Sequence, residues 1–242
     1  MRQMRISDNG PGLIPKFLNF LYPSECPSCS EETDAFSTAP FCSACWSGIK
    51  KYSGPSCSVC ATPFTSEDAR VCSECMKKPP YFAKAISYGL FDGTLATAIS
   101  FFKFQRIKRL HRPLGDLLLT FDMPGIDALI PVPLTIRGLR ERGFNQSLLL
   151  AKTFSDKTKT PLIMDGLLKK RDTAPQIGLS KKERRLNLKR AFSAGRKFPG
   201  MRLLLIDDVM TTCSTADECS KELLRAGAAE VTVLTLARAN YL

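Results

Sequence analysis

The segment from residue 203 to 215 constrains the fold most, because it predicts a buried strand that runs directly into a polar loop. Residues 203–206 are Leu-Leu-Leu-Ile, an uninterrupted apolar run typical of a strand covered on both faces. Asp207 and Asp208 follow at once, and we expect the strand to end there. Carboxylates at the C-terminal end of a strand face the crevice where open α/β sheets bind ligands. The segment therefore predicts an α/β fold with its site at this junction.

A hydroxyl-rich loop follows the two carboxylates and leads into a helix predicted over 216–226, which Gly227 ends. Backbone N–H groups at a helix N-terminus, together with the helix dipole, can hold a phosphate. The paired carboxylates can accept hydrogen bonds from vicinal sugar hydroxyls or hold a hydrated Mg²⁺. The alternative is a polar strand-to-helix turn with Thr or Ser as N-cap and no ligand. The candidate phosphate-binding residues are Thr211, Thr212, Cys213, Ser214 and Thr215.

This segment resembles the 5-phosphoribosyl-1-diphosphate (PRPP) loop of type I phosphoribosyltransferases. Their pattern is two acids, a hydrophobic residue, a variable residue, Thr, Thr, Gly, a variable residue and Thr. The resemblance implies that Asp207 and Asp208 face the ribose and that residues 211–215 hold the 5-phosphate. Cys213 stands where the pattern has Gly. If the loop needs a positive φ there, the Cβ costs about 1 to 2 kcal/mol.

Eight of the ten cysteines form four Cys-x-x-Cys pairs, separated by 12, 11 and 11 residues. Each pair places two thiolates on one side of a tight turn, and two such turns complete a tetrahedral site, so four pairs supply two structural Zn²⁺ sites. We favour sequential pairing into two ribbons, with an interleaved cross-brace as the alternative. Disulfides would need an export signal, which the chain does not show, and catalytic redox pairs would not need fourfold repetition. The predicted ligands are Cys26, Cys29, Cys42, Cys45, Cys57, Cys60, Cys72 and Cys75.

Three parts are expected along the 242 residues: an N-terminal tail over 1–20, a double zinc ribbon over 21–80 and a larger α/β domain over 81–242. In the larger domain we predict strands over 85–91, 128–133 and 231–237, and helices over 94–104, 114–121 and 144–154. The one histidine, His111, has no visible acid partner and is expected to lie on the surface or pack between helices.

Two basic segments are further candidates. Arg137, Arg140 and Arg142 are expected on a short Gly-containing loop after the second strand, where arginines can grip a diphosphate bidentately. The segment 169–192 is expected to be a mobile flap over the substrate, a face for single-stranded nucleic acid, or solvated surface. The formal net charge of +12 favours polyanionic or phosphorylated partners, and the alternative is a soluble basic protein with solvated lysines. No apolar run is long enough to span a membrane, and we expect a cytoplasmic protein.

Short motifs distributed over most of the chain form a combination that is more specific than any one of them. Besides the fourfold Cys module they comprise Phe102 to Phe104, Pro131 to Leu134, Arg137, Arg140, Arg142 to Ser147, Arg171, Thr173, Gln176, Glu183, Arg184, Asn187, Ala191, Phe192 and Asp207 to Val209. This combination resembles the ComF family, phosphoribosyltransferase-like bacterial proteins associated with DNA uptake in natural competence.

The resemblance implies a double zinc ribbon followed by a type I phosphoribosyltransferase fold that binds PRPP with Mg²⁺. An acceptor nucleophile would displace diphosphate from C1 of PRPP, and positioning and charge stabilisation would supply most of the acceleration. Three hypotheses follow. The first is a phosphoribosyltransferase-like enzyme or PRPP sensor. The second is a non-catalytic adaptor that binds either single-stranded DNA or a competence helicase. The third is a protein that retains the fold but no longer binds a ligand.

Overall fold

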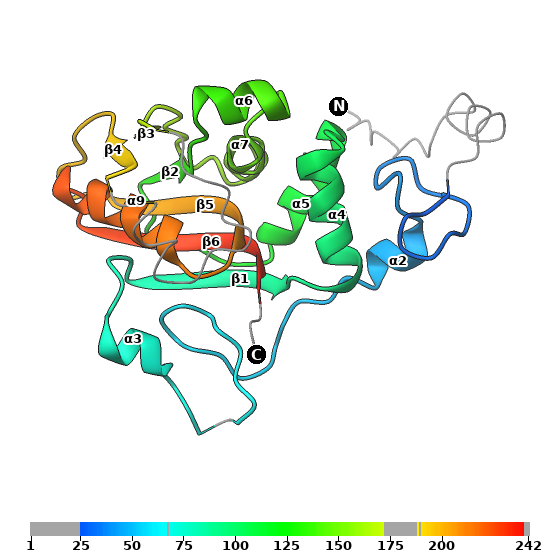
Figure 1. Ribbon diagram of the computed structural model, residues 1–242, viewed down its shortest axis with the longest axis horizontal. Coiled ribbons are helices and arrows are strands. Elements are labelled where there is room, and N and C mark those ends of the chain that lie inside the picture. The colour runs from blue at the N-terminus through cyan, green and yellow to red at the C-terminus, as the bar shows by residue number, and fades with distance from the viewer. Residues whose placement is uncertain (1–24, 67, 172–187, 189, 240–242) are drawn as a thin grey trace, which may run out of the picture.

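The computed structural model describes residues 25–66, 68–171, 188 and 190–239 of the chain. Within these ranges a four-stranded parallel sheet has the strand order β1-β6-β5-β2 (Figure 1). Parallel strands put their C-terminal ends at one edge of the sheet, so this edge collects the loops that can form a site. The strands are β1 (Lys84–Leu90), β2 (Ala128–Pro131), β5 (Arg202–Met210) and β6 (Glu230–Arg238).

Helices cover both faces of the sheet. One face packs against α4 (Gly93–Phe104), α5 (His111–Leu118) and α7 (Gln146–Thr158), with the short 3-10 helix η1 (Lys108–Leu110) between the first two. The other face packs against α9 (Ser214–Arg225) and an antiparallel pair formed by β3 (Leu167–Lys169) and β4 (Phe192–Ala194). This double cover explains why the central strands are apolar without alternation.

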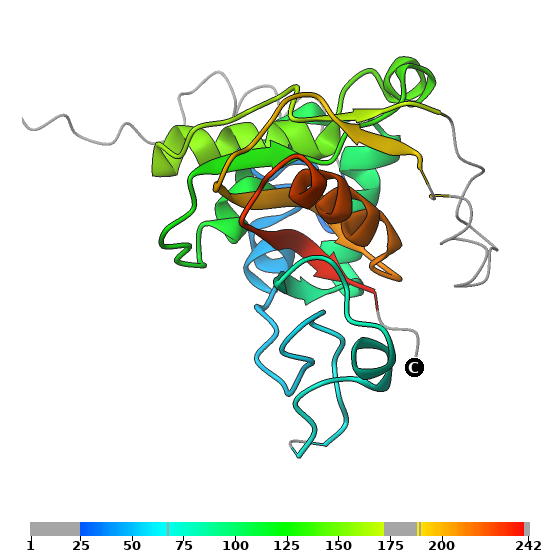
Figure 2. The ribbon, with the colours of Figure 1, turned by 90° about the vertical axis from the view of Figure 1, so that its left-hand side faces the viewer.

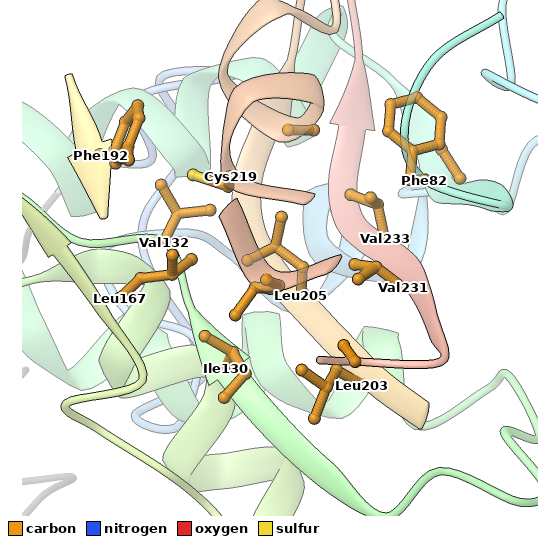
Figure 3. Close-up of a cluster of buried hydrophobic side chains, with 14 of the residues drawn as sticks. Phe82, Ile130, Val132, Leu167, Phe192, Leu203, Leu205, Cys219, Val231 and Val233 are labelled. Carbon is orange, nitrogen blue, oxygen red and sulfur yellow. The ribbon is translucent and has the colours of Figure 1, made fainter. Parts of the chain in front are cut away.

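Successive residues of β5 enter different cores because side chains alternate across a strand. Leu203 and Leu205 are fully buried on the α9 face, whereas Leu204 and Ile206 are fully buried on the α7 face. Figure 3 shows the α9-side core, where Leu205 and neighbouring apolar side chains from β2, β4 and β6 meet Cys219 of α9.

The Cys-rich module consists of two small ribbons that precede the sheet. The first ribbon, residues 25–49, contains α2 (Ser43–Ser47) and lies beside α4 and α5 (Figure 1). The second ribbon, residues 55–78, contains α3 (Ser73–Lys77) and lies next to β1 and β6 (Figure 2). The two ribbons therefore contact different parts of the α/β domain.

The fold class predicted from the sequence is confirmed: a mainly parallel sheet flanked by helices follows a Cys-rich module. Several predicted boundaries are wrong; the helix predicted over 114–121 is α5, and the helix predicted over 144–154 is α7. Two further differences lie at the predicted site. The strand continues through both aspartates to Met210, because β6 extends alongside it and the register pairs Met210 with Arg238. The helix starts at Ser214 instead of 216, directly after a left-handed residue at Cys213.

Several predicted features lie outside the described residues. These are the tail over 1–20 and most of the basic segment 169–192, including Thr173, Gln176, Glu183, Arg184 and Asn187. Where the structure describes the chain, none of its helices combines the length and apolar character that crossing a membrane requires.

Candidate functional site

A cleft of about 950 Å³ opens at the C-terminal edge of the sheet, above β2 and β5. Its walls come from the ends of these strands, the loop before α9, α4 and the short helix α6 (Ile136–Arg142). The cleft is large enough for a sugar with two phosphate groups. Among the predicted site residues, those lining it are Asp207, Asp208, Thr211, Cys213, Ser214, Thr215, Arg137 and Arg142; Thr212 and Arg140 are not in its wall.

Asp207 and Asp208 are held by different partners. Lys103 Nζ, from α4, donates a charge-assisted hydrogen bond to Asp208 Oδ1 at 2.7 Å, and the Asp208 residue is only 5% exposed. Ser147 Oγ, from α7, donates to Asp207 Oδ1 at 2.8 Å, and the Asp208 backbone N–H donates to the same oxygen at 2.9 Å. The two carboxylates thus have fixed orientations beside the cleft, which favours hydrogen bonding to a ligand diol.

Burial raises the pKa of Asp207 to about 6, and the neighbouring charge of Asp208 adds to the increase. Lys103 and the Ser147 hydrogen bond act in the opposite direction. A carboxyl with this pKa is mainly ionised at neutral pH and becomes protonated in mildly acidic solution. Perturbed carboxyls of this kind are common at functional sites.

The loop before α9 has the features expected of an anion site. Cys213, the N-cap residue, makes no side-chain capping hydrogen bond, so no side chain of the cap competes for the N–H groups of the first helical turn. Thr212 Oγ1 and Ser214 Oγ lie 2.9 Å apart. Cys213 adopts φ 63° and ψ −4°, so the position does require the left-handed backbone that glycine prefers.

The predicted arginine loop is instead the helix α6. Thr135 Oγ1 accepts a hydrogen bond from the Gly138 N–H at 3.1 Å and begins the helix, and Gly143 at φ 78° ends it. Arg137 pairs with Glu141 at 2.7 Å within the helix. Arg137 and Arg142 therefore reach the cleft wall from a short α-helix, and the predicted loop is wrong.

The eight paired cysteines form two clusters in sequential order, with the four sulfurs of each within 4.8 Å of one another. A tetrahedral zinc site with Zn–S bonds of about 2.3 Å places its sulfurs about 3.8 Å apart. Cys29 and Cys42 Sγ lie 3.7 Å apart in the first cluster, and Cys60 and Cys72 Sγ lie 3.6 Å apart in the second. Both clusters fit structural Zn²⁺, and the sequential pairing is the one observed.

Comparison with known proteins agrees with this architecture. Residues 17–76 match the double zinc ribbon domain. The chain is 36% identical over 209 residues to Competence protein F of Haemophilus influenzae, covering 82% of this chain and 90% of that protein. This chain belongs to the ComF family. It is also 35% identical over 190 residues to the DNA utilization protein YhgH of Escherichia coli O157:H7, covering 75% of this chain and 83% of that protein.

Among solved structures, this ComF protein is similar to the glutamine PRPP amidotransferase of B. subtilis complexed with ADP and GMP. The identity is 23% and the TM-score is 0.42, over 57% of this chain and 30% of that one. The match thus spans less than a third of the amidotransferase.

The ComF cleft contains residues that the sequence motifs include but that were not predicted as site residues. Lys103 and Ser147 hold the two aspartates, as described above. Gln146 lines the cleft and is 1% exposed; its Oε1 accepts from Arg142 Nη1 at 3.2 Å, while its Nε2 has no hydrogen-bond partner among the described residues. A buried donor without a partner is costly, so a ligand acceptor would satisfy it.

His111 lies outside the cleft, as expected for a packing residue. Its Nδ1 is 2.8 Å from Thr153 Oγ1, so it joins α5 to α7. Burial lowers its pKa, with the charge of Arg112 acting in the same direction.

Proposed function

We propose that the cleft binds a phosphoribosyl ligand, PRPP with Mg²⁺. The ribose hydroxyls would hydrogen bond to Asp207 and Asp208, and the 5-phosphate would occupy the N-terminus of α9 at residues 211–215. The observation that carries the proposal is that two oriented carboxylates and a helix N-terminus without a side-chain cap line one cleft. The carboxylates suit sugar hydroxyls, and the helix N-terminus suits a neighbouring phosphate.

Two further residues support the assignment of the diphosphate. Arg142 lines the cleft next to the unpartnered Gln146 Nε2, and together they present donors to anionic oxygens. Arg137 lies on the same side, whereas Arg140 is exposed outside the wall and would act only at longer range. Bound Mg²⁺ would neutralise part of the diphosphate charge.

Turnover would require an acceptor nucleophile that displaces diphosphate from C1 of the ribose. In that reaction Asp207 and Asp208 would orient the sugar, and the residues at the cleft mouth would stabilise the departing charge. The acceptor is left open, and the same geometry suits a protein that binds PRPP without turnover.

The biological role that we propose is in natural competence, in the handling of DNA that is taken up. The names of the relatives, competence protein and DNA utilization protein, support this role. Ten free cysteines, eight of them in metal-fitting clusters, suit the reducing cytoplasm. We further propose that residues 21–80 and 81–242 are the two functional domains, after a tail over 1–20.

A non-catalytic adaptor for single-stranded DNA or a helicase is the second candidate, and one surface feature favours it. Phe104 is 63% exposed, and the Arg142 guanidinium lies 5.8 Å from its ring centroid at the cleft mouth. Exposed aromatic rings beside cations are platforms on which bases of a single strand stack. Salt-dependent binding of an oligonucleotide that weakens in Phe104→Ala would support this candidate.

Calorimetric titration with PRPP and Mg²⁺ tests the main proposal. The metal-loaded protein should bind, and Asp207→Asn with Asp208→Asn should abolish the heat. The matched control is Asp116→Asn with Asp156→Asn, which removes the same charge from positions on α5 and α7 outside the cleft. Absence of binding by the folded wild-type protein at millimolar PRPP would contradict the proposal.

A further inference from the structure

Arg238, the last residue of β6, is a buried cation at the boundary between the ligand loop and the second ribbon. It is 6% exposed, so its guanidinium must find hydrogen-bond acceptors inside the protein. On the loop side, Nη1 donates to the carbonyl of Met210 at 2.9 Å and to the carbonyl of Thr211, and Nη2 lies 3.6 Å from Cys213 Sγ. The Arg238 side chain therefore contacts three residues, Met210, Thr211 and Cys213, where β5 leads into α9.

The same guanidinium contacts the second ribbon. Arg238 Nε donates to the carbonyl of Cys60 at 3.1 Å, and Nη2 donates to Thr62 Oγ1 at 2.7 Å. Cys60 belongs to the second metal-fitting cluster. Thr62 Oγ1 is also 3.1 Å from Cys60 Sγ. The position of these acceptors thus depends on the ribbon turn that the metal site organises.

Cys213 adds a packing contact between the loop and the ribbon, because its side chain packs against the buried cluster that contains Cys57, Cys60 and Cys75. Its left-handed backbone would be less strained with glycine. The sulfur offers a physical reason for a side chain at this position, since glycine would lose both the contact with Arg238 and the packing against the second ribbon.

A further contact joins the first turn of α9 to the segment that follows the second ribbon. The Tyr81 N–H donates to Asp217 Oδ1 at 2.7 Å in the first turn of α9. In contrast, the first ribbon packs on the α4 side of the sheet, in a different buried cluster from the one that Cys213 packs against. No described residue of either ribbon lines the cleft, so the second ribbon contacts the ligand loop through Arg238 and Cys213.

We propose that Arg238 and Cys213 couple the second ribbon to the ligand loop, so that metal loading of the second site, but not of the first, keeps residues 211–215 ordered. Arg238 is a positioning residue in this account, acting through the loop backbone. The consequence for affinity rests on the proposed PRPP site. The order of the loop does not depend on that proposal and can be measured without ligand.

The test compares Cys72→Ser in the second ribbon with Cys29→Ser in the first, using the full chain loaded with zinc. Backbone ¹⁵N relaxation should give order parameters of about 0.85 for residues 211–215 in the wild-type protein and in Cys29→Ser, and below about 0.6 in Cys72→Ser. Residues 203–206 in the buried part of β5 should stay rigid in all three proteins. Equal loop order in the two variants would overturn the proposal.

Two milder variants keep the test decisive if Cys72→Ser fails to fold. Thr62→Val removes one acceptor of Arg238 without changing a metal ligand, and Arg238→Met removes the cation. Each should lower the loop order parameters and weaken PRPP binding about tenfold, the size expected for losing a hydrogen bond to a charged group. A rigid loop in both variants would contradict the coupling. A loop that loosens in a protein that never binds PRPP would instead contradict only the proposed function.

Discussion

The two ribbons have the same local structure but different neighbours. In the first, the Cys26 N–H donates to the Glu31 carbonyl at 2.7 Å; in the second, the Cys57 N–H donates to the Thr62 carbonyl at 2.8 Å. The residue after each first Cys-x-x-Cys pair, Ser30 or Ala61, has a positive φ. The repeated cysteine pattern therefore specifies one fold twice.

The surroundings of the ribbons differ. Phe41 of the first ribbon is fully buried and makes an edge contact with Phe101 of α4, with ring centroids 5.7 Å apart. The second ribbon hydrogen bonds to β1 through the Ala85 N–H and the Val59 carbonyl at 2.7 Å, and to Arg238 of β6. The comparison indicates that the first ribbon packs on the helical side of the domain, whereas the second is linked through Arg238 to the loop before α9.

Metal removal should give the largest effect, because structural zinc contributes about 10 to 16 kcal/mol in small fingers. Wild-type protein should contain two zinc ions per chain, and Cys26→Ser or Cys57→Ser should each retain one. Proteolysis should then cut residues 25–49 in the first variant and 55–78 in the second. Simultaneous loss of both ions from a folded single variant would contradict two independent sites.

Truncation of a buried aromatic residue beside each ribbon should have the next largest effect; Phe41 belongs to the first ribbon, and Phe82 lies in the same buried cluster as Cys57 and Cys60 of the second. Phe41 is 0% exposed and Phe82 is 2% exposed, so Phe41→Ala and Phe82→Ala should each lower the free energy of unfolding by about 3 to 5 kcal/mol. Phe36→Ala is the matched control, since Phe36 is 57% exposed and should change stability by less than about 0.5 kcal/mol. Urea denaturation measures all three, and equal losses for Phe36 and Phe41 would contradict the packing described.

Cys213 allows backbone strain to be separated from the thiol contact with the second ribbon. Cys213→Gly and Cys213→Ala both remove the sulfur, but only glycine relieves the positive φ. The glycine variant should therefore be about 1 kcal/mol more stable than the alanine variant in urea denaturation. Equal stability would show that the left-handed backbone carries no measurable strain.

The smallest expected effect is that of pH on the ionisation of Asp207 in the cleft. The pKa of Asp207 is raised from 3.8 to about 6, so below pH 6 the carboxyl gains a proton and becomes a weaker acceptor for ligand hydrogen bonds. Because the native state holds this proton more tightly than the unfolded chain, the protonated carboxyl stabilises the fold below its unfolded pKa of 3.8, and this stabilisation is lost as the pH rises through 6.

Carboxyl ¹³C NMR of the ligand-free protein should show this midpoint, assigned by its loss in Asp207→Asn. Ser147→Ala should raise the midpoint further, since the hydroxyl hydrogen bond lowers the pKa. A midpoint at or below 4 would contradict the desolvation of the half-buried Asp207 carboxyl.

The sequence predicted the elements that depend on local pattern. The spacing of the cysteine pairs indicated two tetrahedral sites, and the apolar run before Asp207 indicated the central strand. The helix α6 was missed because Gly138 and Gly143 suggested a loop, whereas the N-cap at Thr135 makes a helix favourable.

Contacts between distant segments could not be predicted in this way. Arg238 and Cys60 are 178 residues apart, and only the tertiary fold brings them within hydrogen-bonding distance. The ion pair of Lys103 with Asp208, 105 residues apart, has the same origin. Periodicity and spacing carry information only about residues that are close in the sequence. The side chains that orient the site, Lys103 and Arg238, are therefore identified only in the structure.

The most direct measurement of the central claim is a crystal structure of the metal-loaded protein with PRPP and Mg²⁺. The account predicts the 5-phosphate at the backbone N–H groups of residues 211–215, the ribose hydroxyls at Asp207 and Asp208, and the diphosphate toward Arg142 and Gln146. A ligand bound elsewhere, or an empty cleft at millimolar PRPP, would contradict it.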